Sequence, residues 1–128
     1  MSIREAVLCH PVRTAIGTYG GSLKDVAAPD LGAAAIRETL RRSGLAADKI
    51  QTLVMGNVIQ AGVKMNPARQ AGIAAGLPVE VPALTVNRVC GSGAQGVASA
   101  ALEVWSGMVD CAIAGGMENM DRAPYLLP

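Results

Sequence analysis

The chain has 128 residues, of which 51% are hydrophobic and 16% charged, and its formal net charge is +1. This length is enough for one small domain with a single core. The composition excludes a disordered chain, which needs fewer apolar and more charged residues. Lys and Arg form no block that could collect the phosphates of a nucleic acid, so we expect no nucleic-acid partner. Phe is absent and Gly contributes 15 residues, a composition that suits closely packed layers and predicts a part of a larger structure.

No targeting or membrane segment is predicted. Residues 1–5 read MSIRE, which is not the apolar stretch of a signal peptide. The most apolar tract, residues 97–109, contains Glu103 and is shorter than the about 20 residues that a membrane helix needs. The three cysteines form no CxxC pair, and without an export signal we expect them to be reduced. The sequence therefore predicts a cytoplasmic protein with no membrane partner.

One strand and one helix are predicted in the first part of the chain. Residues 3–9 have the composition of a strand, and Pro11 ends it because proline cannot donate a hydrogen bond to a strand ladder. A loop with several glycines follows. A helix then begins at Pro29 with its apolar residues on one face. Gly44 is the glycine expected just after a helix C-terminus.

A second strand and a second helix come next. The strand is predicted over residues 50–55. Asn66 is a preferred N-cap residue, and Pro67 stands at the first helical position, where its missing N–H is not needed. This helix is predicted to end near Ala75. The order up to this point is β-α-β-α.

The rest of the chain continues this alternation. A third strand is predicted over residues 83–89, and a helix over residues 91–107 has apolar residues on nearly every face, the pattern of a helix buried all round. A short apolar strand follows at residues 111–114. The order predicts an α/β fold with four strands in a mostly parallel sheet and helices on both faces. Residues 124–128 follow without a covering helix, so we expect a chain cut within a larger architecture.

A cysteine among glycines carries the clearest chemical signal. Residues 86–96 read VNRVCGSGAQG and place Cys90 at the turn between the third strand and the third helix. Gly91 and Gly93 permit a sharp turn and leave room for a substrate. The positive end of the helix dipole lies at the sulfur and favours the nucleophilic thiolate. Cys90 is thus a candidate nucleophile, and the alternative is a small buried core residue, the usual role of an intracellular cysteine.

The same segment matches a dinucleotide-binding pattern. Gly91, Gly93 and Gly96 have the spacing of the GxGxxG fingerprint after a strand. The fingerprint is completed by an acidic residue about 20 positions later, near Glu118. Glu118 lies beyond the end of the predicted strand, however, and pyrophosphate binding does not explain a thiol before the first glycine. A nicotinamide-binding oxidoreductase stays open as an alternative.

Four motifs resemble those of one enzyme family. Residues 86–93 (VNRVCGSG) look like the nucleophile motif of the thiolases, of the acetyl-CoA acetyltransferase type. The other three motifs resemble the thiolase pattern at residues 13–17 (RTAIG), 66–70 (NPARQ) and 115–120 (GGMENM). They stand in the order of the family, and the resemblance covers almost all of residues 1–128. A thiolase would continue well beyond them.

The resemblance implies a mechanism for Cys90. The thiolate would attack an acyl-CoA thioester and carry the acyl group, and the backbone N–H of Cys90 would be one donor of the oxyanion hole. A Claisen condensation would then join two acetyl-CoA to acetoacetyl-CoA, or CoA would cleave a 3-ketoacyl-CoA in the reverse direction. Coenzyme A thioesters are substrates in this scheme, and no permanently bound cofactor or metal is expected.

The remaining catalytic groups of the family do not occur in these residues. The resemblance implies a histidine in a Gly-His-Pro motif, an Asn-Glu-Ala-Phe motif and a second catalytic cysteine, all in a C-terminal half. His10 precedes a proline but follows Cys9, so we expect it to be structural or solvated. Cys9 and Cys111 are expected in the core, because each belongs to a predicted apolar strand. We therefore expect this chain alone to be inactive.

Three further side chains each have two candidate roles. Arg69 either braces active-site loops or a subunit contact, or is a surface charge on a helix. Met117 and Met120 are candidates for an acyl pocket, although filling the core is the commoner use of methionine.

The resemblance also implies an architecture and partners. Residues 1–128 would form most of the N-terminal subdomain of a layered α/β/α/β/α thiolase fold, with helix 91–107 in its central layer. A loop domain and a C-terminal half, on the same or a separate chain, would complete an acyltransferase of fatty acid metabolism. We expect that complete enzyme to be a homo-oligomer, either a dimer or a tetramer. The alternative is a non-catalytic scaffold half of a split thiolase-like complex.

Overall fold

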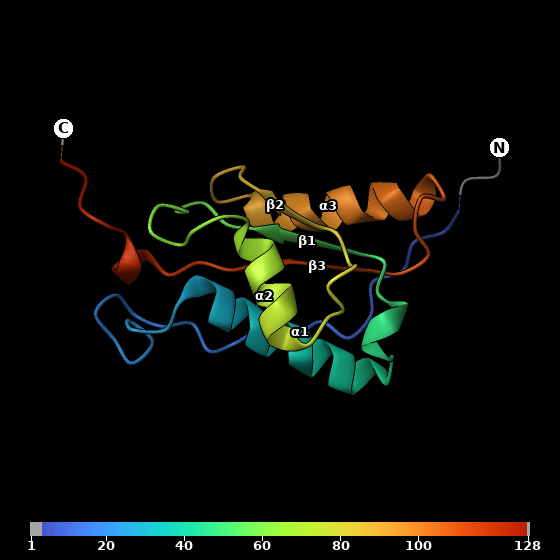
Figure 1. Cartoon of the computed structure of the whole chain (residues 1–128), viewed down its shortest axis with the longest axis horizontal. Helices are drawn as coiled ribbons and strands as arrows, with labels where there is room; N and C mark the ends of the chain where they lie inside the picture. Colours follow the sequence, from blue (N-terminus) through green and yellow to red (C-terminus); the bar gives the residue numbers. More distant parts are fainter. Residues whose placement is uncertain (1–3, 128) are drawn as a thin grey trace.

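The computed structural model describes residues 4–127 and has a sheet between two layers of helices. Its elements are α1 (Ala28–Ser43), β1 (Thr52–Gly56), α2 (Pro67–Ala75), β2 (Ala83–Val86), α3 (Ser92–Trp105) and β3 (Ala112–Gly116), with 3-10 turns η1 (Ala47–Lys49) and η2 (Met120–Arg122). The strands are all parallel in the order β2-β1-β3, and Met55 pairs with both Thr85 and Gly115. Helix α3 lies on one side of the sheet, while α1 and α2 lie on the other (Figure 1). The predicted α/β class with helices on both faces is confirmed.

The predicted first strand is wrong for the residues that the structure describes. Residues 4–9 belong to no strand, and Ile3 lies outside the described residues. The sheet therefore has three strands there instead of four. A cleft of about 430 Å³ lies between this segment and Cys111–Ile113 at the edge strand β3. Backbone groups of the segment do not reach β3 across this space, and a strand needs such a neighbour.

The helix boundaries follow the predicted signals. Gly44 ends α1 with a left-handed φ of 68°, and its N–H donates to the C=O of Leu40. Asn66 is the N-cap of α2, and its side chain accepts the N–H of Arg69 at 3.2 Å. The ends of α2 at Pro67 and Ala75 are those predicted. No helix in residues 4–127 is both long and apolar enough to cross a membrane.

Most of the large buried side chains lie between the sheet and the layer formed by α1 and α2. Leu53 and Met55 of β1 point into this space, where they meet residues of both helices and of the adjoining loops. The buried cluster consists of Ala28, Ile36, Ile50, Leu53, Met55, Ala68, Ala71, Leu77, Val81, Ile113 and Met117. This cluster is the hydrophobic core of the described chain.

Within this chain helix α3 is buried on one face only, and burial all round stays a prediction for a larger fold. Its buried residues Ser92, Gly96 and Ala100 recur every fourth position and face the sheet. Leu102 and Trp105 keep 58% and 46% of their surface exposed. The sequence pattern does not separate these faces, because apolar residues occupy both.

Candidate active site

The loops that follow the three strands surround one cleft. In a parallel sheet the carboxyl ends of all strands lie at the same edge, where α/β proteins bind their ligands. The cleft has a volume of about 560 Å³. It is lined by Gly56–Ile59 at and after the end of β1, by Val89, Cys90, Ser92 and Gly93 after β2, and by Gly116–Glu118 and Met120 at and after the end of β3. Cys90 is exposed in this cleft. The structure thus places the predicted nucleophile where a substrate has access to it.

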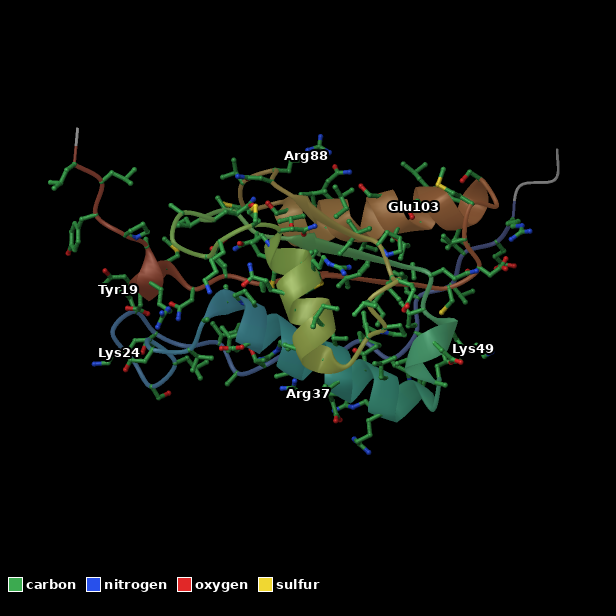
Figure 2. The ribbon with its side chains drawn as sticks, in the orientation of Figure 1. Tyr19, Lys24, Arg37, Lys49, Arg88 and Glu103 are labelled. Carbon is green, nitrogen blue, oxygen red and sulfur yellow. The ribbon has the colours of Figure 1, made fainter. Side chains whose placement is uncertain are left out.

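The turn that presents Cys90 is held by side-chain hydrogen bonds. Val89 has a left-handed φ of 49°, which is an outlier for a β-branched residue. Ser92 Oγ donates to the C=O of Val89 at 2.6 Å and accepts the N–H of Arg88 at 2.8 Å. The side chain of Arg88 extends from this loop (Figure 2) and donates to Gln95 Oε1. The prediction that glycines provide the sharp turn is wrong, because Val89 adopts the left-handed conformation.

Two other glycines, Gly56 and Gly96, allow a close approach of backbones near this turn. A Cβ on Gly56 would lie 2.4 Å from the carbonyl carbon of Ser92. A Cβ on Gly96 would lie 2.8 Å from the C=O of Gly115 and 3.1 Å from that of Val54. No side chain fits at these points. The first turns of α3 therefore rest directly on the ends of β1 and β3, and Cys90 lies just before that helix.

Glu118 is part of the site in a way that the sequence did not predict. Its Oε2 accepts the N–H of Val58 at 2.8 Å, and its Oε1 accepts the side-chain amide of Asn57 at 3.0 Å. Asn87 also contacts this loop, because its Nδ2 donates to the C=O of Val58 at 3.2 Å. The sequence offered one signal for this contact, since Asn57 directly follows β1 and Glu118 closely follows β3. The carboxylate of Glu118 is occupied by these bonds, which removes the main support for the dinucleotide pattern.

The other two thiols and the histidine lie away from the cleft. Cys9 is exposed, so its predicted place in the core is wrong, and His10 beside it is also exposed. Cys111 is half-buried against the core, immediately before β3. Burial, with a smaller contribution from Cys9, raises the pKa of the Cys111 thiol. Cys111 is therefore a poorer nucleophile than an ordinary exposed cysteine.

The structure distinguishes between the candidate roles of Arg69, Met117 and Met120. Arg69 donates to the C=O of Val79 at 2.9 Å and to that of Val81 at 3.2 Å, so it braces the loop before β2, away from Cys90. Met117 is 8% exposed, belongs to the core and also touches the cleft. Met120 is 63% exposed and lines the cleft, so of its two candidate roles the structure excludes the core. Within residues 4–127 no three His, Cys, Asp or Glu side chains gather as a metal site.

Comparison with known proteins identifies the family. The thiolase N-terminal domain model matches residues 6–128. The chain belongs to the thiolase family. Similar proteins include the acetyl-CoA acetyltransferase of Syntrophomonas wolfei, 49% identical over 125 residues, and the beta-ketothiolase BktB of Cupriavidus necator, 52% identical over 126 residues. The acetyl-CoA acetyltransferase of Escherichia coli is 46% identical over 125 residues.

The match covers almost all of this chain but only part of each relative. In all three comparisons 98% of this chain is covered but only 32% of the relative. The chain thus spans about a third of the length of the curated relatives that it matches. The family resemblance predicted from the four motifs is confirmed.

Proposed function

We propose that this chain supplies the acyl-accepting nucleophile of a thiolase-type acyltransferase. The observation that carries the proposal is the exposed thiol of Cys90, just before α3 and in a cleft at the carboxyl edge of the sheet. Three similar proteins named acetyl-CoA acetyltransferase or beta-ketothiolase support acetyl-CoA as the acyl donor. Coenzyme A thioesters are substrates in this proposal, with no resident cofactor.

The first step transfers the acyl group to Cys90. The thiolate attacks the carbonyl carbon of acetyl-CoA, a bond forms between Sγ and that carbon, and the bond from carbon to the CoA sulfur breaks. CoA leaves as a thiolate and takes up the proton that Cys90 has lost. The negative oxygen formed during the attack needs preorganised donors. The backbone N–H of Cys90, beside the N-terminus of α3, is our candidate for one of them.

The second step needs groups beyond those described in this chain. Condensation requires an acid or base for the α proton of a second acetyl-CoA, and such a group is typically worth about 10²- to 10⁴-fold in rate. His10 and Cys111 do not line the Cys90 cleft, so neither is placed to fill that role. We therefore propose that a C-terminal thiolase half, on the same or a separate chain, completes the site, and that residues 1–128 alone are inactive.

The architecture and setting of the enzyme follow from the same proposal. Residues 1–128 would be most of an N-terminal subdomain, with the five-layer fold completed by the C-terminal half. The apolar outer face of α3, which exposes Leu102 and Trp105, supports a central-layer position for this helix. A homo-oligomeric cytoplasmic enzyme is the expected assembly.

The test is formation of an acetyl-enzyme with radiolabelled acetyl-CoA in the active enzyme. We expect the label on Cys90, located by mass spectrometry of peptides, and its loss in Cys90→Ser because a hydroxyl is a far weaker nucleophile than a thiolate. Cys9→Ser is the matched control, since it removes an exposed thiol outside the cleft. Label that persists in Cys90→Ser, or disappears in Cys9→Ser, would refute the proposal.

A further inference from the structure

A carboxylate joins two of the loops around Cys90. Besides Asn57 and Val58, the N–H of Ile59 lies 3.3 and 3.4 Å from the two oxygens of Glu118. Three donors therefore converge on one acceptor. None of the ion pairs found within residues 4–127 involves Glu118. Hydrogen bonds to an ionised acceptor are shorter and stronger than neutral ones, so Glu118 fixes the loop after β1 to the end of β3.

A second connection leads from that loop to the nucleophile. The C=O of Val58 accepts the side-chain amide of Asn87, and Asn87 Oδ1 accepts the N–H of Val89 at 3.0 Å. Val89 directly precedes Cys90 and has the left-handed conformation described above. A residue in a sparsely populated conformation persists only where its surroundings determine it. The path of contacts therefore runs from Glu118 through Val58 and Asn87 to the turn that presents Cys90.

We propose that Glu118 is a positioning residue for Cys90, acting through Val58 and Asn87. The inference rests on the proposed acylation of Cys90. Without the carboxylate the thiol stays exposed and chemically competent, but its direction toward a bound thioester is no longer fixed. A misplacement of about 1 Å can cost about 10²-fold in rate. Acylation is therefore expected to fall, whereas reaction with a small, freely diffusing reagent is not.

The glutamine variant is the sharpest test, carried out in the active enzyme. Glu118→Gln keeps the size of the side chain but turns an NH₂ group toward one of three N–H donors. We expect the single-turnover rate of Cys90 acetylation by acetyl-CoA to fall by about 10²-fold, with kcat lowered more than KM is raised. The rate of Cys90 alkylation by iodoacetamide should stay close to that of the wild type. Glu80→Gln is the matched control, because Glu80 is exposed and does not line the Cys90 cleft.

A second variant tests the same path where a folding defect is less expected. Asn87 is exposed, so Asn87→Ala leaves no cavity, yet it removes both connections to Val58 and Val89. We expect the same separation of acetylation from alkylation. Because both residues act through one path, the loss in the double variant should be smaller than the product of the two single losses.

Each outcome has a distinct meaning. An undiminished acetylation rate in Glu118→Gln or in Asn87→Ala would overturn the positioning role. Equal losses of acetylation and alkylation would also overturn it, because they indicate a general disturbance of the loop. If the wild type itself forms no acetyl-Cys90, the proposed function fails first, and this result is distinguishable from both.

Discussion

The two faces of β1 differ most where the strand ends. Leu53 points toward α2, where its Cδ2 atom lies 2.7 Å from the point that a Cβ on Gly72 would occupy. Large side chains fill this side. On the other side Val54 is fully buried as well, but at Gly56 the strand faces the start of α3 and backbone meets backbone without a side chain between them. The same strand thus packs its largest side chains into the core on one face and, at Gly56, makes a close backbone contact on the other.

This difference separates stability from positioning. Large buried side chains provide most of the free energy of folding, roughly in proportion to the apolar area that they remove from water. A backbone contact buries little apolar area, but it cannot adjust by changing a rotamer, so it fixes the place of α3 tightly. Cys90 lies two residues before the start of α3. We therefore expect substitutions on the first face to change stability and substitutions on the second to change both stability and reactivity.

The largest effect on stability is expected on the α2 face. Leu53 is 1% exposed, so Leu53→Ala should lower the free energy of unfolding by about 2–5 kcal/mol through lost burial and a cavity. Alkylation of Cys90 per folded molecule should not change. Urea unfolding measures the first quantity, with Leu102→Ala on the exposed face of α3 as the control, expected within about 0.5 kcal/mol of wild type. Equal losses in the two variants would contradict the assignment of the core.

Two glycines of α3 allow a matched test of the other face. A Cβ on Gly96 would lie 2.8 Å from the C=O of Gly115, whereas one on Gly93 would come no closer than 3.7 Å to the Cα of Gly116. Gly96→Ala should therefore lower the free energy of unfolding by about 1–3 kcal/mol and slow the acetylation of Cys90. Gly93→Ala should be neutral or stabilise the helix by up to about 1 kcal/mol. Urea unfolding of both variants provides the comparison, and a reversed order would refute the close contact.

Local signals allowed the sequence to predict the helices and the nucleophile. Asn66 and Pro67 determine where α2 begins through a side-chain acceptor and a fixed φ, and both act within a few residues. The place of Cys90 between a strand and a helix was equally local. Signals of this kind can be recognised in a single sequence because they do not depend on residues that are distant along the chain.

The features that could not be predicted depend on distant partners. Residues 4–9 have the composition of a strand, but a strand exists only where a neighbour accepts its hydrogen bonds. Glu118 binds Val58, 60 positions away along the chain, and no spacing rule connects them. For Met120 the sequence left the core and a pocket open, and its place in the cleft depends on how the loop after β3 folds.

The smallest effect is expected on the solvent side of α1, where Arg41 and Arg42 hydrogen-bond to Glu38 and hold its pKa at about 2. Because this pKa lies below the ordinary value of 4.5, the pairing stabilises the fold above that value and is lost as the pH falls toward 2. Exposed ion pairs contribute little and are screened by salt, so Glu38→Gln should lower the melting temperature at pH 7 by only about 1–3 °C. The difference in melting temperature between Glu38→Gln and wild type should shrink at low pH and in high salt. Glu80→Gln is the control, because Glu80 is exposed and belongs to none of the ion pairs found among the described residues. Its melting temperature should equal that of the wild type under all these conditions. A loss as large as that of Leu53→Ala would mean that surface charge stabilises the layer of α1 and α2 as much as the core beneath it does. A loss that persists at low pH, where the pairing is gone, would mean that the ion pairs are not its cause.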